Sequence, residues 1–195
     1  VTNVTLATSE NWKDKSGEYR WLGDMRALIL GEDGQPIALV GGIRDIAERR
    51  QAEAEMAHRL KIESAVAEAS SVLVGAEDVD VGLNAALRIL GEAVGANRAY
   101  CFMLRDNDTK MDNTHEWCAA GTEPQIYNLQ DIDCTAIPWT MERLALGDPV
   151  IVPDTAAVPP DAVAAKKSWK ALNFHSLLAV PLLSDGKPIG YVRFA

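Results

Sequence analysis

Three cysteines and three histidines are the side chains of this 195-residue chain that are best suited to nucleophilic or metal chemistry. Protein metal sites usually need closely spaced ligands, such as Cys-x-x-Cys or His-x-x-x-His, and neither pattern occurs in the sequence. His115, Glu116 and Cys118 are close together, but on a strand His115 and Glu116 would point to opposite faces. The sequence therefore predicts no metal site.

The cysteines, Cys101, Cys118 and Cys134, could serve as the nucleophilic and resolving thiols of an oxidoreductase. Their apolar or mixed surroundings are more typical of buried, unreactive thiols. An odd number of cysteines does not suggest a disulfide framework, so we expect a reducing, cytoplasmic location. The sequence has no kinase motif and no Gly-rich phosphate loop, and we expect no catalytic activity.

Charge and hydropathy exclude two classes of partner. The formal net charge of -9 argues against a nucleic-acid surface, which needs a basic face. The longest apolar run, 177–183, is too short to span a bilayer, and the start of the chain does not resemble a signal peptide. We therefore expect a soluble protein that neither binds nucleic acid nor inserts directly into a membrane.

Residues 46–74 contain no Gly or Pro and are rich in good helix formers, which predicts one long helix. One apolar stripe, expected to pack on the following domain, recurs at spacings of four, three and four: Ile62, Val66, Ala69 and Leu73. Met56 and Leu60 begin a shorter seam, which we expect to pair with a partner helix in a parallel homodimer. No heptad register is sustained, so this coiled coil would be marginal and able to shift register. A solvated helix lying on its own domain is the alternative.

Strands precede and follow this helix. Apolar and polar residues alternate from Tyr19 to Ile29, and an Asp-Gly turn leads to a return strand over 36–45, which predicts a hairpin. A third strand over 4–12 is compatible with the pattern. After the long helix, a second helix begins at Asp78 or Asp80 and ends at Gly95.

The remaining segments predict a mixture of short helices and strands. Helices are expected over 138–145 and from 159 to about 172, each with Pro at its start. Strands are expected at the following positions: 98–105, 113–120, 150–152, 176–183 and 189–195. The first two and the last two of these strands are expected to pair as hairpins, so the fold class is α+β with a mostly antiparallel sheet flanked by helices.

Two family resemblances organise these elements. The motifs Gly17-Glu-Tyr-Arg-Trp21 and Gly41-Gly-Ile-Arg-Asp45-Ile-Ala resemble the C-terminal end of a PAS domain running into its outgoing helix. Ala47 stands where that family usually has Thr, and Asp45 is placed to cap the helix. Only the last strands of a PAS domain are represented, so the resemblance implies no PAS ligand and a fragment of a longer protein.

The second half of the chain, 61–195, resembles a GAF domain without its C-terminal helix. The resemblance is carried by Asn97-Arg98, Trp117, Pro138-Trp139, GDPVIVPD at 147–154 and SLLAVPLL at 176–183, followed by Gly186-Lys-Pro-Ile-Gly190. It implies three regions: a PAS tail over 1–45, a helical connector over 46–60 and the GAF domain.

A GAF fold usually encloses a pocket between its sheet and its middle segment. The resemblance implies these ligand-binding candidates: Tyr100, Trp117, Cys118, Trp139, Asp154, Trp169 and His175. The Asn-Lys…Phe…Asp-Glu motif of cyclic-nucleotide GAF domains is absent, and no Cys is followed by His as in bilin-binding members. Haem would need an axial ligand such as His115 or His175, which are more often ordinary hydrogen-bonded histidines. The cofactor therefore stays unknown.

These resemblances imply a sensory module of a cytoplasmic signal-transduction protein. Such modules feed output domains of histidine kinases or diguanylate cyclases in the same polypeptide, and a small ligand in the pocket would be relayed through the connector helix. Two alternatives stay open. One is a thiol-dependent enzyme similar to free methionine sulfoxide reductases, and the other is a dimerisation module that binds no ligand.

Overall fold

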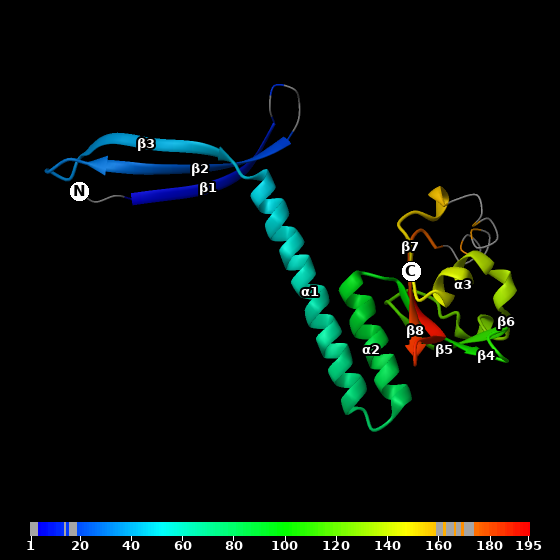
Figure 1. Cartoon of the computed structure of the whole chain (residues 1–195). Coiled ribbons are helices and arrows are strands. Elements are labelled where there is room, and N and C mark those ends of the chain that lie inside the picture. Colours follow the sequence, from blue (N-terminus) through cyan, green and yellow to red (C-terminus); the bar gives the residue numbers. More distant parts are fainter. Residues whose placement is uncertain are drawn as a thin grey trace. The chain divides into compact units, whose positions relative to one another are not determined.

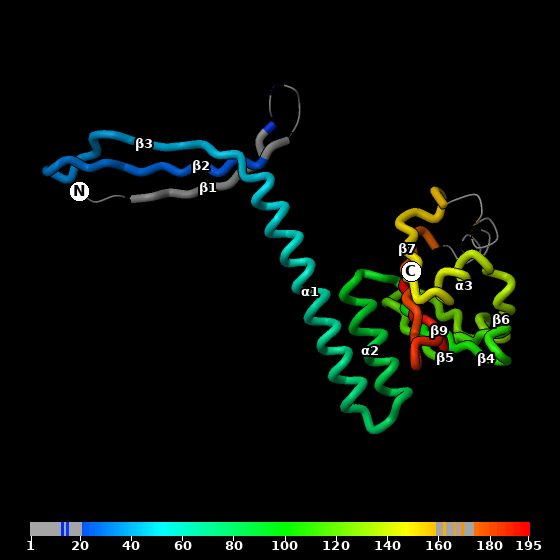
Figure 2. The backbone as a smooth tube through the Cα atoms, viewed as in Figure 1, coloured from blue at the N-terminus to red at the C-terminus, as the bar shows by residue number. Residues whose placement is uncertain are grey.

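A three-stranded antiparallel sheet and the start of a long helix form the first of two structural units, Val1–Leu60 (Figures 1 and 2). The computed structural model describes residues 4–13, 15, 19–158, 162, 166, 169 and 174–195. The strands of this unit pair in chain order: β1 (Val4–Lys13), β2 (Tyr19–Leu30) and β3 (Pro36–Asp45). The predicted hairpin is therefore confirmed, and β1 supplies the third strand.

The junction between β3 and the long helix α1 (Ala47–Gly75) is held by local contacts. The Asp45 carboxylate accepts a hydrogen bond from the Ala47 amide at 2.9 Å, and the Ile46 amide donates to the Trp21 carbonyl at 2.9 Å. The Arg50 guanidinium lies 3.9 Å from the centre of the Trp21 ring. The predicted cap at Asp45 is confirmed, and the single long helix is confirmed as well.

The second unit, Lys61–Ala195, contains the end of α1 and the remaining elements. Helix α2 (Val79–Val94) begins at Asp78, whose carboxylate accepts from the amides of Asp80 and Val81 at 2.8 and 3.3 Å. It ends at Gly95, which has the left-handed φ of 70° that glycine adopts without strain. Asp78 is thus the residue that caps α2.

The face of α1 that packs against α2 includes Ile62 and Ala69 of the predicted stripe but not Val66 and Leu73. Four residues at spacings of three, four and three form it: Ile62, Ala65, Ala69 and Val72. Ala65 and Ala69 are buried, whereas Val66 is 50% exposed and Leu73 is 42% exposed. Small side chains on both helices, including Ala86 and Ala93 of α2, allow the backbones to approach closely, so this alanine face is selected over the bulkier one.

A six-stranded antiparallel sheet is the centre of the second unit, with the order β6-β5-β4-β9-β8-β7. Its strands and the third helix are β4 (Arg98–Arg105), β5 (Lys110–Cys118), β6 (Ile132–Asp133), α3 (Pro138–Ala145), β7 (Val150–Val152), β8 (Leu177–Ser184) and β9 (Lys187–Phe194). The turn Asp185-Gly186 between β8 and β9 has positive φ at both residues, as a two-residue hairpin requires. The α+β fold class is confirmed.

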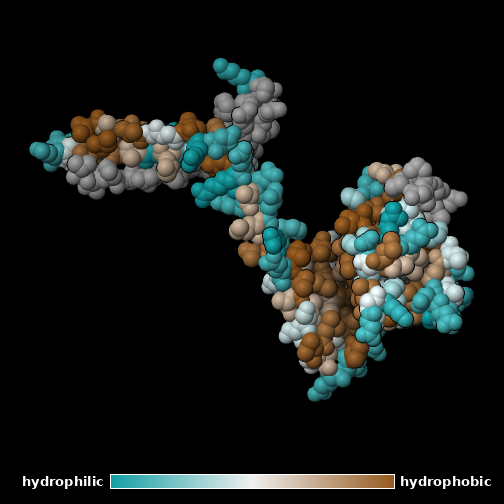
Figure 3. Space-filling view, viewed as in Figure 1, coloured by the Kyte–Doolittle hydropathy of each residue, from teal (hydrophilic) through white to brown (hydrophobic). Residues whose placement is uncertain are grey.

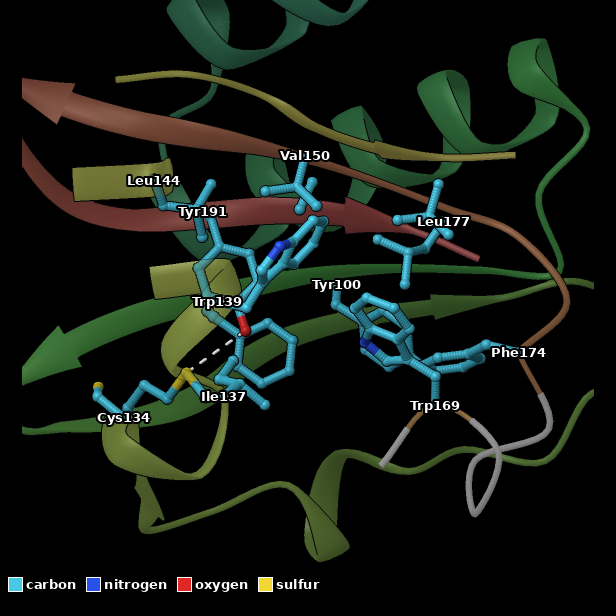
Figure 4. Packing of buried hydrophobic residues seen from close by; sticks show 14 of the residues in the cluster. Tyr100, Cys134, Ile137, Trp139, Leu144, Val150, Trp169, Phe174, Leu177 and Tyr191 are labelled. Carbon is cyan, nitrogen blue, oxygen red and sulfur yellow. Dashed lines mark hydrogen bonds between the residues drawn. The ribbon is translucent and has the colours of Figure 1, made fainter. Parts of the chain in front are cut away.

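Each face of this sheet carries its own core. Helix α2 covers β4 and β5 on one face, where Leu87, Ala99 and Cys101 are buried together. The segment between β5 and β7, which includes α3, covers the other face and helps to bury a cluster rich in aromatic rings (Figure 4). The helix predicted from 159 to about 172 lies outside the described residues except at 162, 166 and 169. Among the residues described, no helix combines the length and hydropathy needed to cross a membrane.

Candidate functional site

A cavity of about 180 Å³ lies between the sheet and the segment that joins β5 to β7. The sheet contributes Phe102 of β4, Leu177 of β8 and Tyr191 of β9, and Phe102 and Tyr191 stack with their ring centres 4.9 Å apart. Ile137 and Thr140 close it from the opposite side. The walls are therefore mainly apolar and aromatic, which is typical of small-molecule pockets.

Arg193 is the charged exception in this cavity. It follows Tyr191 by two residues on β9, so both side chains point to the same face of the sheet. Its guanidinium carbon lies 4.4 Å from the ring centre of Tyr100, 4.9 Å from Phe102 and 4.8 Å from Phe174. Arg193 is only 7% exposed, so aromatic faces replace most of the water around this cation.

Several polar atoms around the cavity are buried without a hydrogen-bond partner in the described part of the chain. They are the Tyr100 hydroxyl, Trp139 Nε1, Thr140 Oγ1 and two nitrogens of Arg193, Nε and Nη2. Burial raises the pKa of Tyr100, and the nearby charge of Arg193 opposes this rise. Most buried polar atoms in folded proteins are hydrogen-bonded, so the unpartnered atoms of Thr140 and Arg193, which line the cavity, are suited to a polar ligand.

Carboxylates on β5 hold the wall of the cavity in place. Glu116 accepts hydrogen bonds from the amides of Gln125 and Ile126, the closest at 2.7 Å, and Asp112 accepts from the Asp131 amide at 2.6 Å. The Asp112 carboxylate also accepts from Nε of Arg105 at 2.7 Å, which lowers the pKa of Asp112. The loop that closes the cavity is therefore tied to the sheet through the side-chain carboxyl groups of Glu116 and Asp112.

Tyr191 lies at the base of the cavity and stays neutral at physiological pH. Its hydroxyl donates to Sδ of Met111 at 3.4 Å, the contact drawn as a dashed line in Figure 4. Burial raises the pKa of Tyr191 from 10.0 to about 12. The Tyr191 hydroxyl therefore keeps its proton to a higher pH in the folded state than in the unfolded chain.

We expect Tyr191→Phe to reduce the alkaline loss of stability. The raised pKa of Tyr191 contributes to the free energy of unfolding. This contribution is fully present below about pH 10 and is lost as the pH rises through about 12, because the phenol of the unfolded state releases its proton first. Between pH 9 and 12 the variant should lose roughly 2 to 3 kcal/mol less unfolding free energy than the wild type, as measured by urea titration. Tyr127→Phe, at a side chain that is 90% exposed, is the control. Equal losses in Tyr191→Phe and the wild type would contradict this expectation.

The structure brings together three of the aromatic residues proposed as pocket candidates. Tyr100, Trp139 and Trp169 belong to one buried cluster, and Trp169 lines the cavity itself. Trp139 and Trp169 meet edge to face, with ring centres 6.1 Å apart (Figure 4). Trp169 thus lines the cavity, whereas Tyr100 and Trp139 belong to the aromatic cluster next to it.

Four other candidates lie away from the cavity. Trp117 points to the opposite face of the sheet, where a Cβ added at Gly91 of α2 would lie 2.5 Å from its Cζ3 atom. Asp154 is exposed and accepts a hydrogen bond from the Ala156 amide at 2.7 Å, so it caps a turn. His175 is exposed and borders a separate, shallow, polar hollow near Arg98. Cys118 is half-buried beside Glu116 and Arg98.

The surroundings of the three cysteines, and of His115 on β5, do not favour nucleophilic or metal chemistry. Burial is the main cause that raises the pKa of Cys101, Cys118 and Cys134, and this favours the unreactive thiol over the thiolate. Both ring nitrogens of His115 lie within hydrogen-bond distance of oxygens: Nδ1 is 2.9 Å from Thr114 Oγ1 and Nε2 is 3.1 Å from Asp80 Oδ1. His115 is therefore occupied by protein partners.

Sequence reasoning missed Arg193, Thr140, Phe102 and Tyr191, all of which line the cavity. Arg193 could have been found from the sequence, because it is the one charged residue among the last seven, IGYVRFA. It follows Tyr191 by two residues, so the two side chains are expected on the same face of the strand. Phe102 has the same phase as Tyr100 on β4. No comparable signal existed for Thr140, since its position depends on how α3 packs against the sheet.

An antiparallel sheet with a helix on one face and a largely apolar cavity on the other defines the α+β architecture of this unit. The GAF domain family matches residues 78–194, which is more than half of the chain. The chain therefore belongs to the GAF domain family. A curated relative is the methanogenesis regulatory histidine kinase FilI of Methanothrix harundinacea (strain 6Ac), 30% identical over 186 residues. This match covers 92% of the chain but 20% of FilI, so the chain spans about a fifth of the relative's length.

Solved structures of GAF domains share this fold at low sequence identity. The phycocyanobilin-bound GAF domain of a cyanobacterial phytochrome has a TM-score of 0.56 and 14% identity, with 68% of this chain and 78% of that chain covered. The nlh2 GAF domain of A. aeolicus, in an inactive state, has a TM-score of 0.51 and 18% identity, with 70% and 80% covered. At these identities the likeness shows the fold alone.

Proposed function

We propose that this chain is a sensory module of a signal-transduction protein, which binds a small molecule in the cavity beside Arg193 and relays the binding through α1 to an output domain. The observation that carries this proposal is the set of unpartnered polar atoms around a mainly apolar cavity. Membership of the GAF family and the similarity to a regulatory histidine kinase support it. The output domain would belong to the same polypeptide, in the cytoplasm.

A continuous set of packed elements supports the relay. Arg193 and Tyr191 face the cavity, whereas Val192 and Phe194 of the same strand lie on the α2 face, where Phe194 is buried with Leu87. Helix α2 in turn packs on α1 through the alanine face. A ligand that favours one position of β9 would thereby bias the packing of α2 on α1, which is a population shift.

The exposed apolar residues of α1 fall into two overlapping heptad seams. One contains Met56, Val66 and Leu73, and the other contains Met56, Leu60 and Val74. All five apolar side chains are 42% to 89% exposed, and apolar residues along α1 are visible in Figure 3. We propose that two copies pair in parallel along these residues, and that a ligand shifts the pair between the two seams. Because polar residues interrupt both seams, neither register would be strongly preferred.

We expect Met56→Asp combined with Leu60→Asp to give a monomer, because two buried like charges would face their counterparts across the seam. Light scattering should show half the mass of the wild type. Leu60 is preferable to Ile62 as a target, since Ile62 packs on α2 and its loss would disturb the fold.

The matched control for this experiment is Tyr127→Asp combined with Leu146→Asp. These two side chains are 90% and 78% exposed and lie outside α1, so they add the same charge at other apolar surface positions. The control should keep the wild-type mass. A dimer that survives in the Met56 and Leu60 variant would place the interface elsewhere.

The first unit fits the proposal that it contributes the closing strands of a PAS domain. Ile37, Leu39 and Ile43 occupy alternate positions on β3 and are 70%, 61% and 69% exposed, and Figure 3 shows apolar side chains over this sheet. A sheet of three strands rarely leaves such side chains uncovered in a complete domain. We propose that further parts of a PAS domain cover them in the longer protein.

The test of ligand binding is native mass spectrometry of the protein purified from its own cells, followed by a thermal-shift screen of small molecules. Ala179 is 1% exposed and lines the cavity, so Ala179→Leu would fill it without changing charge. A compound that binds in the cavity should raise the melting temperature of the wild type and leave the Ala179→Leu variant unchanged. If the screen finds no such compound, a ligand-free dimerisation module becomes the better description.

We propose no catalytic role for the chain. The raised thiol pKa values of Cys118 and Cys134 disfavour the thiolate that a methionine sulfoxide reductase would need as nucleophile. Turnover of free methionine sulfoxide that disappears when these two cysteines are replaced would reverse this proposal.

A further inference from the structure

The guanidinium of Arg193 leaves one complete edge of hydrogen-bond donors unused. The rings of Tyr100, Phe102 and Phe174 contact the charge, but aromatic rings do not replace hydrogen-bond acceptors in the guanidinium plane. Two nitrogens of the Arg193 guanidinium, Nε and Nη2, are buried and have no hydrogen-bond partner in the described residues. These two N–H groups form the side edge of the fork, which is the edge that accepts both oxygens of a carboxylate in parallel.

A buried cation without a counter-ion is costly, so this arrangement requires a compensating anion. Nε and Nη2 of Arg193 have no hydrogen-bond partner in the described ranges, and Arg193 faces the cavity. The Oγ1 atom of Thr140, also unpartnered and on the same cavity wall, provides a further hydroxyl for a polar group. The counter-charge is therefore expected from a ligand.

We propose that the cavity binds a small monocarboxylate, whose two oxygens accept hydrogen bonds from Nε and Nη2 of Arg193 while its apolar body fills the space between Phe102, Leu177 and Ile137. This inference rests on the proposed function, since it names the ligand class of the same cavity. The volume of about 180 Å³ suits such a molecule, because an apolar cavity of about 150 Å³ holds benzene. A phosphate dianion is disfavoured, because one cation among apolar walls would leave its second charge buried and unpaired.

The test compares carboxylates with neutral molecules of the same shape. Benzoate, butyrate and hexanoate are titrated into the full chain by calorimetry, in parallel with benzyl alcohol, butanol, hexanol and inorganic phosphate. At least one carboxylate should bind about 10-fold or more tightly than its alcohol, because the alcohol cannot occupy both donors. Phosphate should bind more weakly than that carboxylate.

Two substitutions at Arg193 then identify the group responsible. Arg193→Met should weaken carboxylate binding by about 30-fold or more and leave alcohol binding unchanged. Arg193→Lys keeps the charge but loses the paired donors, so an intermediate loss of roughly 5- to 10-fold is expected. Arg88→Met is the control, because Arg88 is exposed on α2 and pairs with Glu92 at 3.2 Å. Its affinity should equal that of the wild type.

The outcomes separate the two proposals. If alcohols bind as tightly as carboxylates, the carboxylate assignment fails while the proposal of a ligand cavity stands. If phosphate binds more tightly than every carboxylate and Arg193→Met abolishes this, the anion is not a carboxylate. If no carboxylate, alcohol or phosphate binds the folded wild type, the carboxylate proposal is overturned, and the screen with Ala179→Leu decides the broader one. If Arg193→Met does not fold, Arg193→Lys and the wild-type comparison still give the answer.

Discussion

Gly190→Ala should destabilise the second unit by about 3 kcal/mol or more. Gly190 lies in the middle of the sheet, where β9 pairs with Met103 of β4 on one side and Leu182 of β8 on the other. A Cβ at this position would lie 2.1 Å from the carbonyl oxygen of Phe102. Because that atom belongs to the backbone, a change of side-chain rotamer cannot relieve the clash, and the two strands must separate.

Urea unfolding monitored by circular dichroism would measure this loss. Ile189→Ala is a suitable control, because its side chain is 40% exposed on the same strand and its removal costs little. The stability of this control should lie within about 1 kcal/mol of the wild type. A Gly190→Ala protein with unchanged midpoint would mean that the strands tolerate a wider separation than the structure implies.

Trp139→Ala should cost about 3 to 5 kcal/mol of unfolding free energy, the usual range for removing a buried tryptophan. The ring is 9% exposed and meets Trp169 edge to face, with an angle of 77° between the planes. The guanidinium carbon of Arg143 lies 3.9 Å from the centre of the Trp139 ring. Truncation would therefore remove the aromatic contact of α3 with Trp169 and leave Leu144 as its buried residue in the cluster.

Trp139→Phe distinguishes lost packing from a disturbed hydrogen bond. Trp139 Nε1 is buried without a partner in the described residues, so phenylalanine loses no hydrogen bond and keeps an aromatic face against Trp169. The cost of this variant should be about 1 to 2 kcal/mol. Equal thermal stability of the Ala and Phe variants would show that the ring packing contributes less than the geometry indicates.

Both substitutions also bear on the proposed site. Gly190 lies next to Tyr191, and Trp139 precedes Thr140, so each supports a residue that lines the cavity. A ligand that binds between the sheet and α3 would be expected to stabilise the same contacts by mass action. The thermal-shift screen should therefore be most sensitive in the second unit.

Local sequence signals predicted most of the individual elements correctly. Pro138 begins α3, Gly95 ends α2, and Asp185-Gly186 connects β8 to β9, as expected from the conformations that these residues prefer. Such preferences depend on a few neighbouring residues, so they can be read without knowledge of the fold. The strand predicted over 113–120 instead spans Lys110–Cys118, because strand ends depend on the partner strand.

The candidate site was predicted less completely, since it depends on how distant elements meet. Tyr100 pairs with Glu116 and Ala99 pairs with Trp117, so Tyr100 and Trp117 face opposite sides of the sheet. Sequence periodicity defines the phase of each strand separately, but the pairing register decides which phases share a face. The register shift between Cys101 and Phe102 cannot be read from either strand alone.

The sequence by itself determined the order and type of the elements, the GAF-like character of the second half and the aromatic residues available for a pocket. The tertiary structure alone decided that Arg193 lies against three aromatic rings with two donors unused, and that an alanine face of α1 packs on α2. The physical reason is range: propensities and caps act within a few residues, whereas burial and charge compensation depend on residues far apart in the chain.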